Sequence, residues 1–273
     1  MFGAIIGDIV GSIYEDVNVK TKDFPLFDVR CTFTDDTVLT IATARWLLEQ
    51  GDCYKHYYEL TRKYPDRGYG TNYMKWFFQI KFHNNPQPYN SCGNGSAMRI
   101  SPVGWAFNTI DDTLRAAKIS AECTHNHPEG IKGAQAIALC VFLARQGSAV
   151  KEIKQKIEDE FGYDLTMNIN ELRMQYSWDG IDGEGNGGLC QHSVPQAIMC
   201  ALQASDFEDA IRNAVSIGGD SDTISCITGG IAEALFGIPG TILSTAMSYL
   251  PEDLIQIASR FEKIYGKKVL SNY

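Results

Sequence analysis

Apolar residues recur at intervals of three and four positions along most of this chain, which is the periodicity of amphipathic helices. The pattern predicts helices over 36–51, 113–123, 130–147, 150–162, 193–204, 206–217, 223–237 and 252–266, with Gly51 as the C-cap of the first. Alternating strand patterns are nearly absent, and no Pro- or Ser-rich linker divides the chain. The sequence therefore predicts one all-α domain over residues 1–273.

The opening segment, MFGAIIGDIVGSIYE, is apolar enough to be compared with a signal peptide or a membrane helix. It lacks a basic amino-terminal region and carries Asp8 and Glu15, so it fits neither. Its apolar residues follow helical spacing, and Gly3, Gly7 and Gly11 form a separate stripe along which a second helix can approach closely. We expect a buried helix that presents Glu15 at its C-terminal end, with Asp8 in a structural hydrogen-bonding role.

Charge and cysteine content narrow the function classes. The 273 residues carry a formal net charge of -9, which argues against a broad basic surface for nucleic acid, although a small patch can still hold one diphosphate. The eight cysteines include no Cys-x-x-Cys pair, and several lie in apolar helical runs, as Cys140 does. We expect reduced, buried thiols in a cytoplasmic protein.

Two short acidic clusters, each opening a predicted helix, are the strongest candidates for chemistry. The stretch FTDDTVLT contributes Thr34, Asp35 and Asp36, and SIGGDSDTIS contributes Asp220, Asp222 and Thr223. Asp, Ser and Thr are the preferred N-caps, and acidic residues at a helix start interact favourably with the helix dipole. Capping alone therefore explains either cluster taken by itself.

The presence of two such clusters favours a metal site over two caps. A cap needs one acceptor, and a second adjacent carboxylate adds repulsion without satisfying another donor. Four carboxylates with hydroxyl oxygens, brought together from distant segments, suit a pair of hard divalent cations. Neither cluster contains His or Cys, which favours two Mg²⁺ or Mn²⁺ ions over zinc.

Five segments in order along the chain resemble the motifs of the ADP-ribosylglycohydrolase family. They are GAIIGDIVGSIYE, FTDDT, GNGSAMRISPVGW, THNHPEGIKGAQA and SIGGDSDTISCITGGIAEA, and CQHSVPQAI fits a further recurring segment. The resemblance covers nearly the whole chain. It implies a single compact multi-helix domain with a cleft that holds a binuclear metal centre.

The resemblance also implies roles for the acidic residues. The expected metal ligands are Thr34, Asp35 and Asp36 from one side and Asp220, Asp222 and Thr223 from the other. Glu15 matches the glutamate that closes the family's first motif, so it becomes the candidate proton shuttle, metal ligand or gate, with Asp36 as the second catalytic carboxylate. The alternative for Glu15 is a solvent-facing position at a helix end.

The loop CGNGSAMR is the expected diphosphate cradle. It is neither a Walker A loop nor a Rossmann fingerprint, and an ordinary helix-linking turn is the alternative. The resemblance gives its substrate contacts as Gly93, Asn94, Gly95, Ser96 and Met98, with His125 in the same pocket, and Arg99 is expected to anchor the loop through an ion pair. More generally, ligand contacts are expected in the Gly- and Asn-rich loops 64–73, 83–97, 124–130 and 178–190. The last of these lacks EF-hand spacing and is expected to be a mobile loop beside the cleft.

Three function classes follow from these residues together with the family resemblance. The leading one is a metal-dependent hydrolase that cleaves the N- or O-glycosidic bond between ADP-ribose and a protein side chain or small conjugate. The alternatives are a binuclear-metal phosphohydrolase or pyrophosphatase acting on a nucleotide-type substrate, and a non-catalytic ADP-ribose-binding module. The expected partner is an ADP-ribosylated protein or conjugate, with no membrane, no broad nucleic-acid binding and a monomeric state. Arginine, serine, a nucleobase and a small metabolite all stay open as the acceptor.

Overall fold

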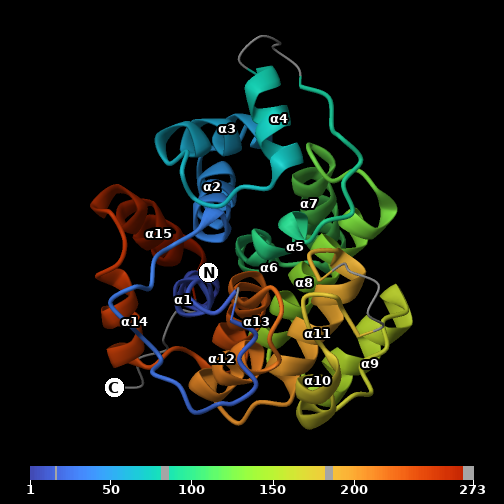
Figure 1. Ribbon diagram of the computed structural model, residues 1–273. Helices are drawn as coiled ribbons and strands as arrows, with labels where there is room; N and C mark the ends of the chain where they lie inside the picture. The colour runs from blue at the N-terminus through green and yellow to red at the C-terminus, as the bar shows by residue number, and fades with distance from the viewer. Residues whose placement is uncertain (16, 81–85, 182–186, 267–273) are drawn as a thin grey trace, which may run out of the picture.

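Every regular element is a helix in the computed structural model of the chain, across the residues that it describes: 1–15, 17–80, 86–181 and 187–266 (Figure 1). The predicted all-α fold is confirmed. In chain order the helices are α1 (Phe2–Gly11), α2 (Asp35–Glu49), α3 (Cys53–Lys63), α4 (Thr71–Ile80), α5 (Gly95–Met98), α6 (Ser101–Ala106), α7 (Ile110–Glu122), α8 (Pro128–Arg145), α9 (Val150–Phe161), α10 (Ile169–Gln175), α11 (Cys190–Leu202), α12 (Phe207–Ser216), α13 (Ser221–Phe236), α14 (Gly240–Met247) and α15 (Glu252–Tyr265).

Helix α1 lies near the centre of the molecule against α13, and its glycines set the separation of the two helices (Figure 1). All residues of α1 are buried. A Cβ atom built on Gly3, Gly7 or Gly11 would lie 2.1, 1.9 or 2.4 Å from a backbone oxygen of α13. No side chain fits in these gaps, because real Cβ atoms essentially never approach another atom within 3.0 Å. The predicted close approach is confirmed, and the approaching helix is the one that begins with the second acidic cluster.

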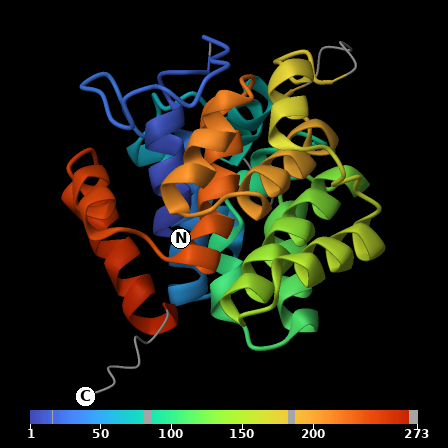
Figure 2. The ribbon, with the colours of Figure 1, turned by 90° about the horizontal axis from the view of Figure 1, so that it is seen from below.

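The remaining helices surround this central pair. Helices α8, α11 and α12 pack against α13, while α2 packs against α1, α3 and α15. Figure 2 shows α14 and α15 on one flank and the α7–α9 region on the opposite flank, with α1 and α13 between them. Within the described ranges, no helix combines the length and apolar character needed to cross a membrane.

The caps of α2 and α13 test the capping explanation of the two acidic clusters. Thr34 has extended backbone dihedrals and its hydroxyl accepts a hydrogen bond from the Asp36 N–H at 3.3 Å, so it is an N-cap as well as a candidate ligand. Asp220 occupies the corresponding position before α13, but its side chain makes no capping hydrogen bond. Capping therefore accounts for Thr34 and leaves the carboxylate of Asp220 for another role.

Several predicted boundaries differ from the structure: α7, α8 and α11 begin two or three residues before the predicted starts at 113, 130 and 193. Six helices of the described residues were not predicted: α3, α4, α5, α6, α10 and α14. Helix α2 ends one residue earlier than expected, with Gln50 as its C-cap, and both Gln50 and Gly51 have positive φ angles. Helix α1 ends at Gly11, so Glu15 lies in the turn that follows rather than at the helix end. The predicted loop 64–73 includes the first residues of α4.

Candidate active site

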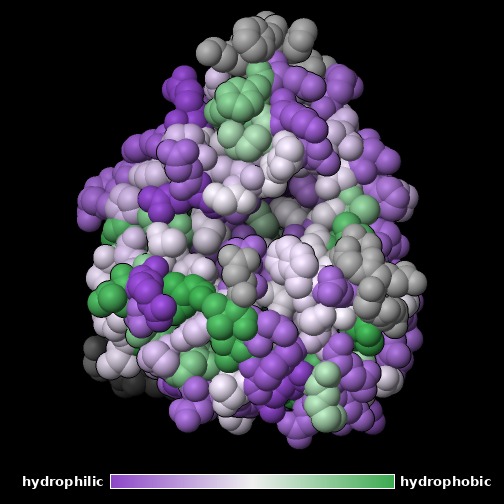
Figure 3. All heavy atoms as spheres, viewed as in Figure 1, coloured by the Kyte–Doolittle hydropathy of each residue, from purple (hydrophilic) through white to green (hydrophobic). Residues whose placement is uncertain are grey.

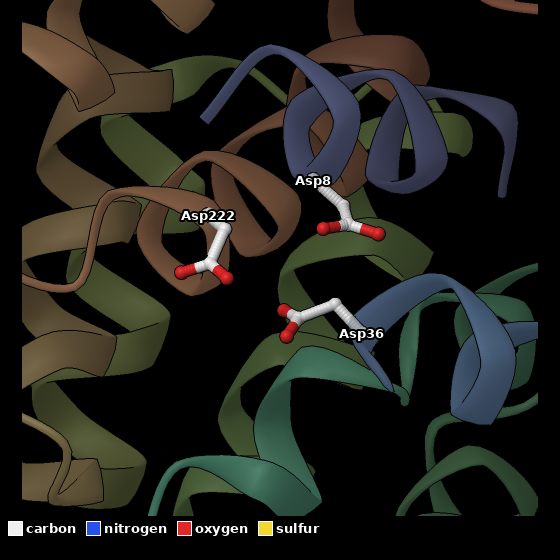
Figure 4. A group of neighbouring side chains, drawn as sticks. All are labelled: Asp8, Asp36 and Asp222. Carbon is white, nitrogen blue, oxygen red and sulfur yellow. The ribbon is translucent and has the colours of Figure 1, made fainter. Parts of the chain in front are cut away.

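Three aspartates from three helices point toward one another (Figure 4), and two of them, Asp36 and Asp222, line a cleft. Asp8 comes from α1, Asp36 from α2 and Asp222 from α13, all are buried, and carboxylate oxygens of the three lie within 4.8 Å of one another. Glu15, Asp220 and Asp222 form a second such group, also within 4.8 Å. Because Asp222 belongs to both groups, together they offer oxygen ligands to two neighbouring cations.

The two acidic clusters meet directly, although 187 positions separate Asp36 from Thr223. The hydroxyl of Thr223 donates to Asp36 Oδ2 at 3.3 Å, and the hydroxyl of Thr34 lies 3.5 Å from the same oxygen. The other carboxylate oxygen of Asp36 is buried and has no hydrogen-bond partner among the described residues. Leaving a buried acceptor unsatisfied costs about 1–3 kcal/mol. A cation at this oxygen would remove that cost.

Asp8 makes the structural hydrogen bonds that were expected from the sequence, but the sequence did not indicate that it would lie beside Asp36 and Asp222. Its carboxylate accepts hydrogen bonds from the Thr34 N–H at 2.9 Å, the Thr34 hydroxyl at 2.7 Å and the Thr37 N–H at 3.1 Å. These bonds fix the start of α2 against α1. The same carboxylate belongs to the group with Asp36 and Asp222, so Asp8 is a further candidate ligand or supports the ligands directly.

Burial and mutual repulsion perturb these carboxyl groups. Burial raises the pKa of Asp36 and of Asp222 well above the usual range, and neighbouring carboxylates raise each pKa further. No lysine or arginine in the described part of the chain forms an ion pair with either residue. Such a cluster is unfavourable as an array of bare anions. Divalent cations bound among these carboxylates would offset both the cost of desolvation and the mutual repulsion.

A cavity of about 390 Å³ opens above the carboxylates, within the size range of small-molecule sites. Figure 3 shows the surface hollowed near the centre of this face. All of the predicted metal ligands line the cavity, as do Glu15 and most predicted substrate contacts: Thr34, Asp35, Asp36, Asp220, Asp222, Thr223, Gly93, Asn94, Gly95, Met98 and His125. The structure thus brings residues from both ends and the middle of the chain into one cleft.

The glycine loop is held beside the second acidic cluster. The side-chain amide of Asn94 donates to Asp220 Oδ2 at 2.7 Å, and its backbone N–H donates to Gly188 O at 2.9 Å. An isolated antiparallel bridge joins Gly93 to Leu189. The loop is therefore clamped between the candidate metal site and the start of α11.

His125 lies against the same loop in a neutral form. Its Nδ1 atom is 2.7 Å from the Thr124 hydroxyl, and burial together with the nearby Arg99 guanidinium holds its pKa well below the usual range. A Cβ atom built on Gly95 would lie 3.1 Å from His125 Nε2, so glycine allows the ring to approach this closely. The ring nitrogen Nε2 therefore faces the loop, where a neutral imidazole can donate or accept a hydrogen bond.

Two expectations for this region need correction. Ser96 is fully buried, its hydroxyl donates to Gly130 O at 2.7 Å, and it does not line the cavity, so its side chain anchors the loop from behind. Arg99 is also fully buried, but its partners are neutral: it donates to Ser120 O and to the Thr124 hydroxyl, both at 2.8 Å, and lies over the Tyr57 ring. Arg99 anchors its surroundings through hydrogen bonds and a cation–π contact, and the expected ion pair is not among the interactions of the described residues.

Each of the four Gly- and Asn-rich loops contributes to the cleft wall, as predicted, but several individual residues were missed. Three of them are aromatic and come from three different loops: Tyr73, Tyr89 and Trp178. The others lie before or within the first turn of α4: Gly68, Gly70, Thr71 and Asn72. The sequence signal that could have identified the aromatic members is their occurrence inside glycine-rich stretches. Residues 182–186 of the fourth loop lie outside the described residues, so its expected mobility stays a prediction.

An all-helical fold with a ligand-sized cleft that ends in buried oxygen donors suits a hydrolase that works with hard divalent cations. The family model for ADP-ribosylglycohydrolase matches residues 1–269, and the chain belongs to that family. Its activity class is accordingly the hydrolysis of ADP-ribosyl linkages.

Individual relatives agree with this membership. ADP-ribosylhydrolase ARH3 of Homo sapiens is 28% identical over 97% of this chain and 92% of its own length. ADP-ribosylarginine hydrolase Tri1 of Pseudomonas putida (strain GB-1) is 24% identical over 88% of this chain and 70% of its own length. A solved structure described as an ADP-ribosylglycohydrolase-related protein complex superposes with a TM-score of 0.71 over 97% of both chains, at 23% identity, which supports the fold.

Proposed function

We propose that this protein is a Mg²⁺- or Mn²⁺-dependent ADP-ribosyl hydrolase that breaks the N- or O-glycosidic bond between ADP-ribose and an acceptor. The observation that carries the proposal is the pair of overlapping carboxylate groups, whose members Glu15, Asp36, Asp220 and Asp222 line a cleft beside a glycine loop. The carboxylate groups supply the ligands of a metal centre, and the glycine loop suits a diphosphate. No broad basic surface for other phosphate ligands is expected at a net charge of -9.

The donor set fits two hard cations. Its members are carboxylate and hydroxyl oxygens, and one buried oxygen of Asp36 has no other partner. The proposed ligands are Thr34, Asp35, Asp36, Asp220, Asp222 and Thr223, with Asp8 as an addition from the structure. Cations bound there would polarise the ribose hydroxyls and lower the pKa of a nearby water.

Glu15 is the proposed proton carrier. It lines the cleft and is one of three neighbouring carboxylates, with Asp220 and Asp222. As water attacks the anomeric carbon, the glycosidic bond to the acceptor breaks, and positive charge develops on the ribose. In this proposal Glu15 accepts the proton of that water and passes it to the departing acceptor. Asp36, held by Thr223, keeps its catalytic assignment as the carboxylate that orients the reacting centre.

The diphosphate is proposed to lie against the glycine loop and the first turn of α4, neither of which contributes an acidic side chain to the cavity. The glycine loop at Gly93–Gly95 permits close backbone approach, and the first turn of α4, with its N–H groups unpaired within the helix, lines the same cavity. Neutral His125 can hydrogen-bond a ligand without adding charge. These features hold the nucleotide as a handle while the bond at the distal ribose breaks.

Product analysis tests the proposal against its main alternative. Incubation with arginine- or serine-linked ADP-ribosyl peptides and Mn²⁺ should yield free ADP-ribose and the unmodified peptide, detected by mass spectrometry. A phosphohydrolase that used the same carboxylates would give AMP or inorganic phosphate as the main metal-dependent product. That outcome would overturn the proposal, and binding of ADP-ribose without any turnover would support a non-catalytic module instead.

The cellular setting is part of the same proposal. All eight cysteines are free, six of them buried and two partly exposed, which supports a reducing compartment, and we place the protein in the cytoplasm. We further propose that it is a monomer, because the cleft is built from a single chain. Thiol labelling in intact cells and light scattering of the purified protein test these two statements.

A further inference from the structure

Lys20 lies in the segment between α1 and α2 that also carries Glu15, and its ammonium group joins two helix ends. It donates hydrogen bonds to the backbone oxygens of Tyr176 and Ile217. Tyr176 is the C-cap of α10 and Ile217 is the C-cap of α12. A cation is favourable there, because carbonyls at a helix C-terminus lack partners within the helix and carry the negative end of its dipole. Helix α12 has no basic residue of its own in its last turn.

Both helix ends lead directly into the cleft. Ile217 is followed by Gly218, Gly219 and the candidate ligand Asp220, and Tyr176 is followed two positions later by Trp178, which lines the same cavity. One ammonium group therefore joins three segments: the one with Glu15, the one with Asp220 and Asp222, and the one with Trp178.

The three segments meet without spare room. Gly218 and Gly219 have φ angles of +75° and +74°. A Cβ atom built on Gly218 would lie 2.0 Å from Asn18 Oδ1 and 3.0 Å from Lys20 Nζ, and one built on Gly219 would lie 2.6 Å from Tyr176 Cε1. A shift of any one segment would consequently displace the loop that ends at Asp220.

The alternative is that Lys20 is an ordinary surface lysine, but its contacts differ from those of such a residue. Although part of its side chain is exposed, its ammonium group is bound to two backbone carbonyls rather than to a carboxylate in water. Burial, followed by the charge of Arg173, lowers the pKa of Lys20, so the ammonium gives up hydration to occupy this position. Hydrogen bonds from a charged donor to otherwise unpaired carbonyls are stronger than exposed ion pairs.

We propose that Lys20 is a positioning residue of the hydrolase, which holds the Glu15 segment, the Gly218–Asp220 loop and Trp178 in the arrangement that catalysis requires. The role in turnover rests on the proposed function, whereas the role in ordering the loop does not. Because small displacements of catalytic groups are costly, loss of the ammonium should lower kcat more than it raises KM.

The test compares Lys20→Met, which keeps the length of the side chain and removes its donors, with Lys20→Arg, which keeps them. Lys151→Met, on the exposed face of α9, is the matched control. We expect Lys20→Met to lower kcat by about 10- to 100-fold, to change KM less than threefold and to be rescued to within about threefold by Lys20→Arg. Amide hydrogen exchange of the metal-free protein should accelerate about tenfold over 217–221 and 176–180 in Lys20→Met only.

Failure of this inference can be told apart from failure of the proposed function. If wild-type protein releases no ADP-ribose, the exchange measurement still decides whether Lys20 orders the loop. Exchange and kcat within twofold of wild type in Lys20→Met would overturn the inference, and so would equal exchange changes in Lys151→Met. If Lys20→Met does not fold, Lys20→Leu, which also has no donor, takes its place, and unaltered exchange in that variant counts equally against the inference.

Discussion

Replacement of Gly7 by alanine should separate the two helices on which the candidate site is built. The added Cβ would lie 1.9 Å from Ser225 O, 2.3 Å from Ser225 C and 2.7 Å from Cys226 N. All three are backbone atoms of α13, so no side-chain rotation relieves the overlap. Ordinary contact requires about 3.4 Å, and the helices must therefore part by about 1.5 Å at this point.

The expected cost follows from this displacement. Overpacking a core typically costs about 1–3 kcal/mol, and the upper end applies because α1 is buried on every side. For a chain of this size, a loss of about 3 kcal/mol corresponds to a fall in Tm of roughly 6–12 °C. Because Asp8 follows Gly7 directly, Mn²⁺ should also stabilise the variant less than it stabilises wild type.

Urea denaturation with and without Mn²⁺ measures both effects. Gly240→Ala is the control, because Gly240 is exposed at the start of α14 with no atom within 4 Å of an added Cβ. This control should raise the free energy of unfolding by about 0.4–1 kcal/mol, because alanine leaves the unfolded chain fewer conformations than glycine does. A loss below 0.5 kcal/mol in Gly7→Ala, with unchanged stabilisation by Mn²⁺, would refute the claim that this contact sets the geometry of the site.

Three further substitutions address single residues. Asp222→Asn should remove a repelling, buried carboxylate, so the metal-free protein should be no less stable while the Mn²⁺-dependent rise in Tm is lost; an undiminished rise would exclude Asp222 as a ligand. Glu15→Gln should lower turnover by about 10²–10⁴-fold and leave ADP-ribose affinity nearly unchanged in calorimetry, and near-normal turnover would return Glu15 to a passive role. His125 is held neutral, with its folded pKa below that of the unfolded chain, so the unfolded state takes up its proton first and the protein loses stability as the pH falls below about 6.5. Denaturation curves at pH 7 and pH 5 should show less of this loss in His125→Asn, and equal losses would contradict the assignment.

The sequence was sufficient for the features that depend on local pattern. Helical periodicity predicted the long helices, and the stripe of Gly3, Gly7 and Gly11 predicted a close helix neighbour, because spacing along one helix face requires no knowledge of the partner. Helices α3 and α4 were not predicted, and the first residues of α4 were assigned to a loop, since Gly68 and Gly70 beside it are typical of a loop. The spacing of Tyr73, Trp76 and Phe77, all buried on α4, was the available helical signal.

The presence of two similar acidic clusters predicted that they would meet, as they do, but other features of the site depend on distant contacts that no local pattern shows. Asp8 is a single acid inside an apolar helix, and only the fold shows that its carboxylate meets Thr34 and Asp222. The motif containing Ser96 correctly located a glycine loop, but a motif does not say which face of a short helix a side chain occupies. Arg99 was expected to have an acidic partner, yet its Nη2 group donates to the Ser120 carbonyl and the Thr124 hydroxyl, while its Nε and Nη1 groups have no hydrogen-bond partner among the described residues.

The same helix contact links the stability of the fold to the proposed chemistry. Glycines bring α1 against α13, and this brings Asp8 and Asp222 close together in a buried place where like charges repel. This repulsion destabilises the metal-free fold. Cations that bind only the folded state would remove the repulsion and raise the free energy of unfolding. A chain selected for packing alone would place apolar side chains at these positions, because buried unpaired carboxylates are costly. The carboxylates at the tightest helix contact are therefore best explained by a ligand that the fold was shaped to hold.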